Sequence, residues 1–407
     1  MALAPTDGVE ARCRVGAGAA SSGQAHYRWA SVLELRKVEA AAVPGLAVAW
    51  EGLAGRAARS PFELPAWLLP WLRHYGTDRR AFLLTWWRAG ELVAVAPLAW
   101  RRRRLRGIPV RELEFWGRTG TPLRGWVDLL VDEADREEVS ADLGRWLARS
   151  SVGWDLFHVL HMAPDSPTLA ALSSGRLRWR VGLTRVLHSQ EYVLALPADG
   201  ADWRGPLGAK ARHEVRRQAR LFERRGGRLE VVSDPDHATL LVAALHDLMT
   251  RRWQGLEAYF RRDPVFADFF ATAVRSLLGS GAGRVFVARD GQGIQACLVT
   301  TVSPPNAMAT LIGVTSAPEY EPLSLGKCLF EAAIRDAATR GCRTFSFLTE
   351  DGYKESFWQA TRRPVECGFV ARGPIGLLLT AGVIPRRVLP ASLRDLLRGH
   401  WRDRYRP

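Results

Sequence analysis

The chain has 407 residues, a length that suits two domains of ordinary size. Hydrophobic residues make up 47% and charged residues 24%, which excludes an intrinsically disordered chain. No apolar run approaches the ~20 residues of a membrane-spanning helix. The five cysteines form no C-x-x-C pair, which argues against a disulfide framework or a cysteine-rich zinc site. We therefore expect a cytoplasmic protein.

The net charge of +15 comes almost entirely from arginine, since only four of the 57 basic residues are lysine. A basic surface suits nucleic acid, anionic lipid or an acidic cofactor. Composition does not choose among these partners, so the position of the charge along the chain has to be considered.

The predicted elements of the first half follow a leader. Residues 1–26 are rich in alanine, glycine and serine and are expected to be disordered. Periodicity then predicts, in chain order, a strand over 29–43, helices over 44–59 and 65–75, strands over 81–87, 92–101, 111–117 and 126–131, a helix over 136–150, a strand over 154–162 and a helix over 166–175.

The second half is predicted to repeat much of this order. It contains a strand over 191–196, a basic helix over 203–225, a strand over 228–233, helices over 239–253 and 264–278, strands over 284–289, 294–303 and 307–315, a helix over 326–341, a strand over 343–349, a helix over 353–362 and a strand over 365–372. Residues 376–407 are expected to form a basic amphipathic tail.

Each half contains a hairpin with glycine in its turn, Gly90 in the first and Gly291 in the second. In both halves a further strand, a helix and a buried strand follow the hairpin. Few residues are identical between the halves, so the repeat lies in the order of elements. We favour duplication over coincidence because the shared order is long.

A candidate anion site lies where the strand over 307–315 leads into a helix. The helix begins at Ser324-Leu325-Gly326-Lys327, and helix amino termini bind phosphates through unpaired N–H groups. On these residues alone, ordinary helix capping is the stronger interpretation. The corresponding helix of the first half begins with the acids of residues 132–138, which would repel a phosphate. If one half binds an anionic cofactor, it is the second.

A second polar group follows the buried strand Phe345-Ser346-Phe347-Leu348. Glu350, Asp351, Tyr353 and Lys354 lie at its carboxyl end, where open α/β sheets bind ligands. These side chains suit a general base, a general acid or a phosphate contact. A solvated turn with a helix cap explains the same residues equally well.

These segments resemble the tandem GNAT acyltransferases of the CelD-like and Fem types. The similarity covers roughly residues 30–372 and lies mainly in Tyr320–Gly326, Phe345–Leu348 and Tyr353–Trp358. Two positions depart from the pattern: Leu325 replaces a common proline, and Ser346 stands where aspartate is common. If that aspartate orients the acceptor, its absence slows, alters or abolishes activity.

The resemblance implies an α/β (α+β) fold of two GNAT-like domains, each with a mixed, mostly antiparallel sheet flanked by helices. We expect a non-catalytic first domain over 27–190 and a second domain over 191–375 that binds acyl-CoA and performs catalysis. The expected reaction transfers an acyl group from acetyl-CoA or another acyl-CoA to an amine or hydroxyl, in polysaccharide, cell-envelope or natural-product modification.

The resemblance also implies residue roles. The expected cofactor-binding residues are Gly313, Val314, Ser324, Leu325, Gly326 and Lys327, with amides near Gly313 and Val314 polarising the thioester. The expected catalytic residues are Tyr320, Glu350, Asp351, Tyr353 and Lys354. No metal is expected, because His158 and His161 lie on opposite faces of one predicted strand.

Two alternatives remain open. A Fem-type transferase that uses aminoacyl-tRNA explains the basic surface better, and a catalytically silent GNAT-fold binding protein is consistent with Ser346. The acceptor is expected to be a small molecule, a glycan or a lipid, with tRNA as the weaker candidate. The basic helix over 203–225 and the tail also suit peripheral contact with an anionic membrane at its inner face.

Overall fold

The structure of the chain is a computed structural model that describes residues 32–105, 108–119, 126–149, 152–173, 181–197, 209–252, 263–348 and 353–373. The predicted leader and tail lie outside these residues. The strands are β1 (Leu33–Glu39), β2 (Arg80–Arg88), β3 (Glu91–Leu105), β4 (Ile108–Phe115), β5 (Leu130–Val131), β6 (Leu156–Met162), β7 (Val181–Ala195), β8 (Arg228–Val232), β9 (Gly283–Asp290), β10 (Gly293–Ser303), β11 (Asn306–Val314), β12 (Thr344–Ser346) and β13 (Thr361–Arg372).

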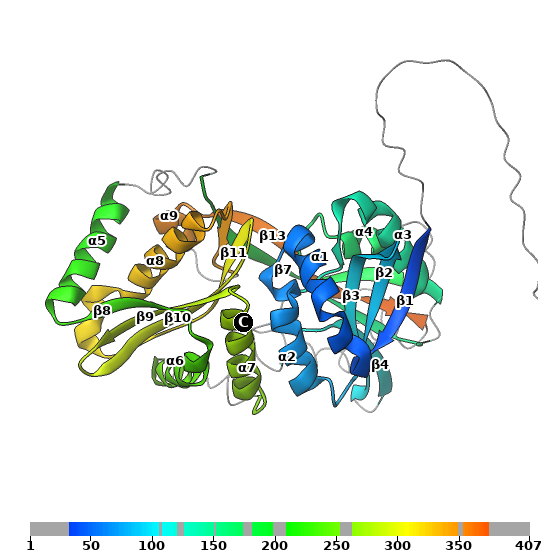
Figure 1. The fold of residues 1–407 in the computed structure, drawn as a ribbon, viewed down its shortest axis with the longest axis horizontal. Coiled ribbons are helices and arrows are strands. Elements are labelled where there is room, and N and C mark those ends of the chain that lie inside the picture. Colours follow the sequence, from blue (N-terminus) through cyan, green and yellow to red (C-terminus); the bar gives the residue numbers. More distant parts are fainter. Residues whose placement is uncertain are drawn as a thin grey trace, which may run out of the picture. The chain divides into compact units, whose positions relative to one another are not determined.

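Helices flank these strands (Figure 1). They are α1 (Ala47–Ala57), α2 (Pro65–Tyr75), α3 (Arg136–Arg149), α4 (Pro167–Ser173), α5 (Ala209–Arg224), α6 (Ala238–Arg252), α7 (Phe266–Gly279), α8 (Leu325–Thr339) and α9 (Tyr353–Trp358), with short 3-10 turns that include η2 (Pro61–Glu63) and η5 (Pro318–Leu323). None of the described helices is long and apolar enough to cross a bilayer.

The described strands form one mixed sheet in the order β1-β2-β3-β4-β6-β13-β7-β12-β11-β10-β9-β8, with β5 paired to β3. In the first half β1 to β4 are antiparallel neighbours, and β4 then runs parallel to β6. In the second half β8 to β11 are antiparallel neighbours, and β11 runs parallel to β12. A parallel pair needs a crossover connection, which contains α3 in one half and α8 in the other. This shared topology confirms the predicted tandem fold.

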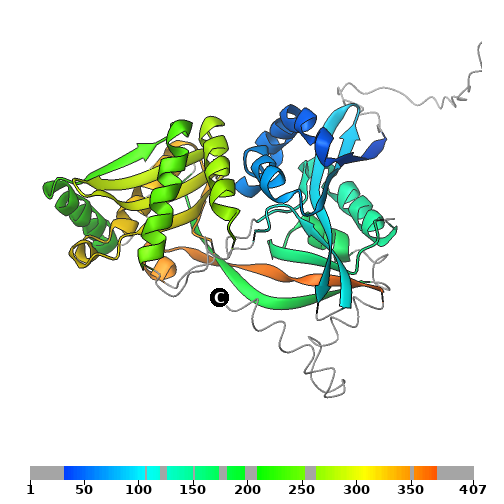
Figure 2. The same ribbon diagram turned by 90° about the horizontal axis from the view of Figure 1, so that it is seen from below.

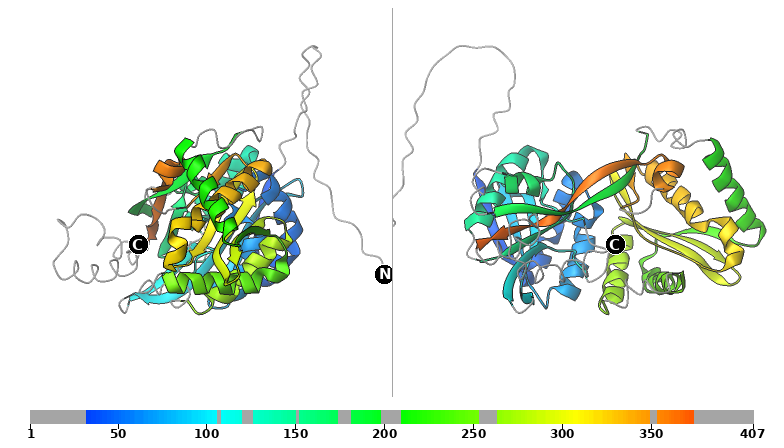
Figure 3. Two further views of the ribbon diagram at one scale, coloured as in Figure 1. Left: turned by 90° about the vertical axis from the view of Figure 1, so that its left-hand side faces the viewer. Right: turned by 180° about the vertical axis from the view of Figure 1, so that it is seen from behind.

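Two long strands join the halves (Figures 2 and 3). Strand β13 pairs antiparallel with β7 along its whole length and also with β6 of the first half. Strand β7 in turn pairs with β12 of the second half. The last described strand of the chain therefore takes part in the sheet of both halves.

The sheet of the second half is covered on both faces. One face packs against α5 and α8, and the other packs against α6 and α7. Strand β9 shows the expected alternation. Phe286 packs in the core on the side of α5 and α8, whereas Val285 and Val287 pack in the core on the side of α6 and α7. Helix α7 also contacts α2 of the first half, where the Tyr75 hydroxyl donates to Asp263 Oδ2 at 2.6 Å.

The clearest differences from the sequence prediction concern four strands and one helix. The strand predicted over 126–131 is reduced to β5. Strand β7 begins at Val181, ten residues before the predicted start, because the polar residues of this segment hide the strand while the pairing with β13 forms it. Strand β12 ends at Ser346, and Leu348 adopts a positive φ of 59°. Helix α9 ends at Trp358, before Gln359 with a φ of 58°. The predicted first strand is shortened to β1 by a following 3-10 turn.

Glycine at position 313 has a packing reason. A Cβ atom there would lie 2.9 Å from Leu245 Cδ1 and 3.1 Å from both the Leu245 carbonyl oxygen and Leu248 Cβ. Helix α6 therefore lies on β11 at a distance that only glycine permits. Because β11 leads to the candidate site, this close contact helps to fix the position of the site.

We expect Gly313→Ala to lower the free energy of unfolding by about 1–3 kcal/mol, because the added methyl group must displace α6. Urea unfolding measures the change. Gly291→Ala is the matched control, since a Cβ at Gly291 meets nothing within 4 Å. Equal stabilities of the two variants would contradict the packing argument.

A buried carboxyl group in η2 makes the stability of the chain depend on pH. Glu63 is 4% exposed, and its side chain accepts hydrogen bonds from the Arg59 and Ser60 amides. Burial, together with the nearby carboxyl of Asp128, raises the pKa of Glu63 from 4.5 to about 8. The folded state therefore keeps a proton that the unfolded state releases between these two values.

We expect the free energy of unfolding to fall as the pH rises from 4.5 to about 8, by at most about 1.4 kcal/mol per pH unit from this group. Glu63→Gln stays neutral at every pH and removes this contribution. Urea unfolding at pH 5, 6.5 and 8 compares the two proteins, with the exposed Glu51→Gln as control. Parallel pH profiles of wild type and Glu63→Gln would contradict the prediction.

Candidate active site

Strands β11 and β12 separate where the candidate site lies. They pair in parallel only from Asn306↔Thr344 to Met308↔Ser346. Strand β11 then continues to Val314, whereas the chain after Ser346 turns to β7, so that the Phe347 amide donates to the Tyr192 carbonyl at 2.9 Å. Beyond Met308, β11 has no strand partner on this edge among the described residues. An open edge of backbone groups results.

The direction of the β11 amides follows from one hydrogen bond. The Thr315 amide donates to the Gln295 carbonyl at 2.8 Å, so it points toward β10. Because successive backbone amides of a strand alternate in direction, the Gly313 amide also points toward β10, while the Ile312 and Val314 amides point to the open edge. Of the two predicted thioester contacts, Val314 is the one that the backbone directs there.

A register shift also marks this part of β11. Val299 of β10 is paired with Leu311, while the next residue, Thr300, is paired with Ala309. Thr310 is therefore an extra residue in β11, and its hydroxyl lies 3.3 Å from that of Thr301. Such bulges are common beside active sites, where they bend a strand away from its neighbour.

The first turn of α8 packs on the same end of β11. Ser324 has a left-handed conformation (φ 44°) and ends η5, and its carbonyl accepts from the Lys327 amide at 2.8 Å. A Cβ at Gly326 would lie 3.4 Å from Val314 Cγ2 and 3.6 Å from Ile312 Cδ1. The structure thus brings Val314 together with Ser324, Leu325, Gly326 and Lys327, as predicted for a cofactor site.

The Lys327 side chain also ties three helices together. Its Nζ lies 2.7 Å from Glu214 Oε1 of α5 and 4.1 Å from the centroid of the Phe357 ring of α9. The hydrogen bond from Lys327 lowers the pKa of Glu214, so this carboxylate stays ionised. Lys327 therefore places a cation at the start of α8 while holding α5 and α9 beside it.

Of the five predicted catalytic residues, two are described in full, and these two lie in different surroundings. Glu350 and Asp351 lie outside the described residues, as does the side chain of Tyr353. Lys354 is 3% exposed, and its Nζ lies 4.4 Å from the centroid of the Phe330 ring. Tyr320 donates its hydroxyl to Asp290 Oδ2 at 2.5 Å, and burial together with this bond raises its pKa to about 12. Asp290 belongs to the hairpin of β9 and β10, so the Tyr320 hydroxyl faces away from the open edge.

One acidic residue beside Ser346 was not among the predicted site residues. Val193 of β7 is paired with Ser346, and Glu191 lies two residues earlier on the same face of the sheet. The Ser346 hydroxyl donates a hydrogen bond to the Glu191 carboxylate and accepts one from the Leu348 amide at 3.1 Å. The only signal in the sequence was an acid at the start of an otherwise apolar predicted strand.

The described cysteines do not suit a nucleophilic role. Cys297, Cys328, Cys342 and Cys367 are all buried, and none of these four is in a disulfide bond. Burial raises the pKa of Cys328 to about 12 despite its place in the first turn of α8. The described residues also contain no cluster of histidine, cysteine, aspartate or glutamate that could hold a metal ion.

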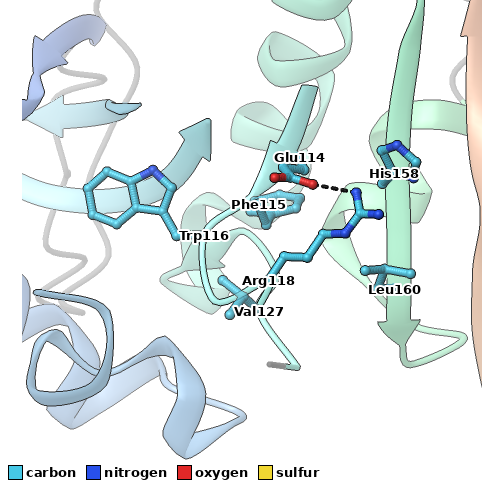
Figure 4. A pocket seen from close by; sticks show the side chains of 7 residues that line it. All are labelled: Glu114, Phe115, Trp116, Arg118, Val127, His158 and Leu160. Atoms are coloured by element: carbon cyan, nitrogen blue, oxygen red, sulfur yellow. Dashed lines mark hydrogen bonds and ion pairs between the residues drawn. The ribbon is translucent and has the colours of Figure 1, made fainter. Parts of the chain in front are cut away.

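The equivalent point of the first half, where β4 and β6 pair, is occupied by charged side chains (Figure 4). Glu112 and Glu114 are each 1% exposed and lie within 3.3 Å of arginine nitrogens. The arginines are Arg79, Arg101, Arg103 and Arg118. Figure 4 shows the Arg118 guanidinium between Glu114 and His158, in a small pocket that these residues line.

This network is consistent with a structural role for the first half. Arg118, Arg101 and Arg79 hold the pKa of Glu114 below its usual range against the effect of burial, and burial lowers the pKa of His158. Acids also occupy the start of the crossover helix, where Arg88 lies 2.7 Å from Asp135. The two halves share a topology but differ in the charge at this point.

Comparison with known proteins agrees with this geometry. Residues 209–355, which run from α5 into α9, match the family described as acetyltransferase (GNAT) domain. Among solved structures, FemX has a TM-score of 0.59 at 11% identity and covers 81% of this chain and 97% of its own.

Two further solved structures are more distant. A tandem GNAT protein from the clavulanic acid biosynthesis pathway has a TM-score of 0.45 at 15% identity, with 84% of this chain and 99% of its own covered. The C-terminal domain of a putative lysylphosphatidylglycerol synthetase from Agrobacterium fabrum has a TM-score of 0.48 at 12% identity, with coverages of 82% and 92%. Comparison with the sequences of curated proteins finds no significant match. Residues 209–355 of the second half therefore match a GNAT acetyltransferase domain, and the chain shares its fold with FemX.

Proposed function

We propose that the second half transfers an acyl group from an acyl-CoA, such as acetyl-CoA, to an amine or hydroxyl acceptor. The observation that supports this most directly is the junction of β11 and α8. The open edge of β11 and the first turn of α8 meet where Gly326 lies beside Ile312 and Val314. An extended thioester carrier with a diphosphate has both a strand edge and a helix amino terminus to bind.

The described residues fit such a carrier. The first turn of α8 offers backbone N–H groups at Leu325 and Gly326, ahead of the helical bond from Lys327 to Ser324. The missing side chain of Gly326 lets a diphosphate approach the backbone closely, and Lys327 adds positive charge. The acyl-CoA supplies an activated acyl group, and the Val314 and Ile312 amides are placed to polarise its carbonyl.

Positioning would then supply much of the rate. Glu350, Asp351 and Tyr353 remain candidates for proton transfer, because they follow the strand that borders the open edge. Tyr320 is engaged with Asp290, so we assign it a structural role. Lys354, packed on Phe330 and Phe347, holds α9 against the end of β12.

The first half is proposed to be non-catalytic, with the boundary between the halves within β7. We further propose that the protein works in the cytoplasm on a small-molecule, glycan or lipid acceptor, in cell-envelope or natural-product modification. Its basic surface suits peripheral contact with the inner face of an anionic membrane.

We expect Gly326→Asp to lower the affinity for acetyl-CoA at least tenfold, because a carboxylate would stand where the diphosphate binds. Isothermal titration calorimetry measures the affinity. The fold is expected to persist, since an acid in the first turn stabilises a helix. Gly326→Ala is the matched control: its methyl group makes only ordinary contacts with Val314 and Ile312, and it should bind nearly as wild type does. Unchanged affinity in folded Gly326→Asp would remove the assignment.

A second candidate donor is aminoacyl-tRNA, as in Fem-type proteins. Helix α5 favours it, because Arg216, Arg217, Arg220 and Arg224 are exposed along one side. Four such cations would follow a phosphate backbone and make binding depend strongly on salt.

Replacing these four arginines with alanine separates the two donors. Under the acyl-CoA proposal the variant keeps its affinity for acetyl-CoA, since it retains Glu214, the residue of α5 that binds Lys327. If tRNA is the donor, wild type should bind tRNA with an affinity that falls by orders of magnitude between 50 and 200 mM salt, and the variant should lose that binding. Filter binding across a salt series measures this. A silent binding protein would show neither turnover nor donor binding.

A further inference from the structure

Glu191 is a half-buried acid that has no role in the reaction described so far. It lies on β7, one strand away from β12, and reaches the carboxyl end of β12 along a diagonal of the sheet. The position it reaches is Ser346, where the resemblance noted in the sequence led us to expect aspartate. The carboxylate that this chain lacks on β12 is thus present on the neighbouring strand.

The surroundings of Glu191 hold its carboxylate in place. The Ser346 hydroxyl donates to the carboxylate, and the Leu348 amide, 3.1 Å away, fixes the Ser346 oxygen from the other side. The Leu348 carbonyl in turn accepts from the Tyr192 amide at 3.0 Å. A short loop of backbone and side-chain hydrogen bonds therefore links Glu191 to the point where β12 leaves β11.

The face of the sheet also matters. Phe345 and Phe347 pack with Phe330 of α8, so they lie on the face of that helix. Ser346, which alternates with them, lies on the opposite face with Met308 and Glu191. If the donor enters beside α8, Glu191 lies on the opposite face of the separating strands, where its side chain keeps partial exposure.

On the basis of the proposed acyl transfer, we propose that Glu191 is the general base for the acceptor and that Ser346 is its positioning residue. The acceptor N–H or O–H gives its proton to a Glu191 oxygen, and its lone pair forms the bond to the thioester carbonyl carbon. The C–S bond breaks, and the proton passes from Glu191 to the CoA thiolate. The products are the acylated acceptor and CoA.

The electrostatics suit this role. Burial raises the pKa of Glu191 above its ordinary value, while the Ser346 hydrogen bond and the charge of Arg363 oppose the rise. Arg363 of β13 is paired directly with Glu191 across the sheet. A raised pKa makes a stronger base, and the opposing groups keep the carboxylate available in its ionised form.

A purely structural role would explain the hydrogen bond from Ser346 to Glu191. It would not use all the acceptor sites of the Glu191 carboxylate. An ionised carboxylate has about four acceptor sites, and among the described residues it receives one side-chain hydrogen bond, from Ser346. A base with remaining acceptor capacity can still receive the proton of an incoming acceptor.

The test uses the full-length protein, acetyl-CoA and two acceptors, with release of the CoA thiol as the readout. Water needs a base to become a nucleophile, whereas neutral hydroxylamine does not. We expect Glu191→Gln to lower the water-dependent rate at least a hundredfold and the hydroxylamine-dependent rate less than fivefold. It should also remove the acidic limb of the pH profile. Glu319→Gln, an exposed acid in η5, should behave as wild type.

A carboxylate restored on β12 tests the position. The water-dependent rate of the double variant Glu191→Gln/Ser346→Asp should be at least tenfold higher than that of Glu191→Gln, because an acid again stands at the end of β12. A double variant as slow as Glu191→Gln would overturn the placement. Glu191→Gln within threefold of wild type, or equal losses with both acceptors, would overturn the base assignment.

Acetyl-CoA binding is measured on every protein, so that failure of this inference differs from failure of the proposed function. Glu191→Gln should bind acetyl-CoA as wild type does, which also shows that the variant is folded. Wild type that binds acetyl-CoA and transfers to neither acceptor would overturn the base assignment alone. Wild type that binds no acyl-CoA would overturn the proposed function as well.

Discussion

The candidate site depends on the point where β11 and β12 cease to pair. Only three residues of each strand are paired, and the β11 backbone beyond them is left without a partner on that edge among the described residues. A strand edge without a partner is usually a liability in a folded protein. Here the edge is held open from both sides: Thr310 bulges out of the register with β10, and Leu348 turns the other strand toward β7. Close packing of α6 on Gly313 and of α8 on Val314 then keeps the end of β11 in place.

The two halves show how one topology can carry different sites. Each has a hairpin, a third strand, a crossover helix and a parallel strand. In the first half the parallel pair is flanked by Glu112, Glu114 and their arginines, and the crossover helix begins with acids. In the second half the same helix begins with Gly326 and Lys327. The two halves therefore differ in the charge at one helix start rather than in topology, which is the difference that the proposed site for an anionic carrier requires.

The sequence was sufficient for the order of elements and for the junction of β11 with α8, because both depend on local patterns. Hydrophobic periodicity predicts α2 over 65–75 without error, and the glycine turns predict both hairpins. Long-range pairing was hidden: the start of β7 is visible only through its register with β13. The hydrogen-bond partner of Tyr320 was hidden for the same reason, since Asp290, which accepts from its hydroxyl, lies 30 residues away.

The same limit applies to Ser346. Comparison along one strand finds a missing aspartate and suggests an impaired enzyme. A sheet, however, places side chains of neighbouring strands within reach of one another, so a functional group can be supplied from either strand. Glu191 and Ser346 are 155 positions apart in the chain, yet their hydrogen bond sets a carboxylate at the end of β12. The position of a charge in space, rather than the strand that supplies it, determines which proton it can accept.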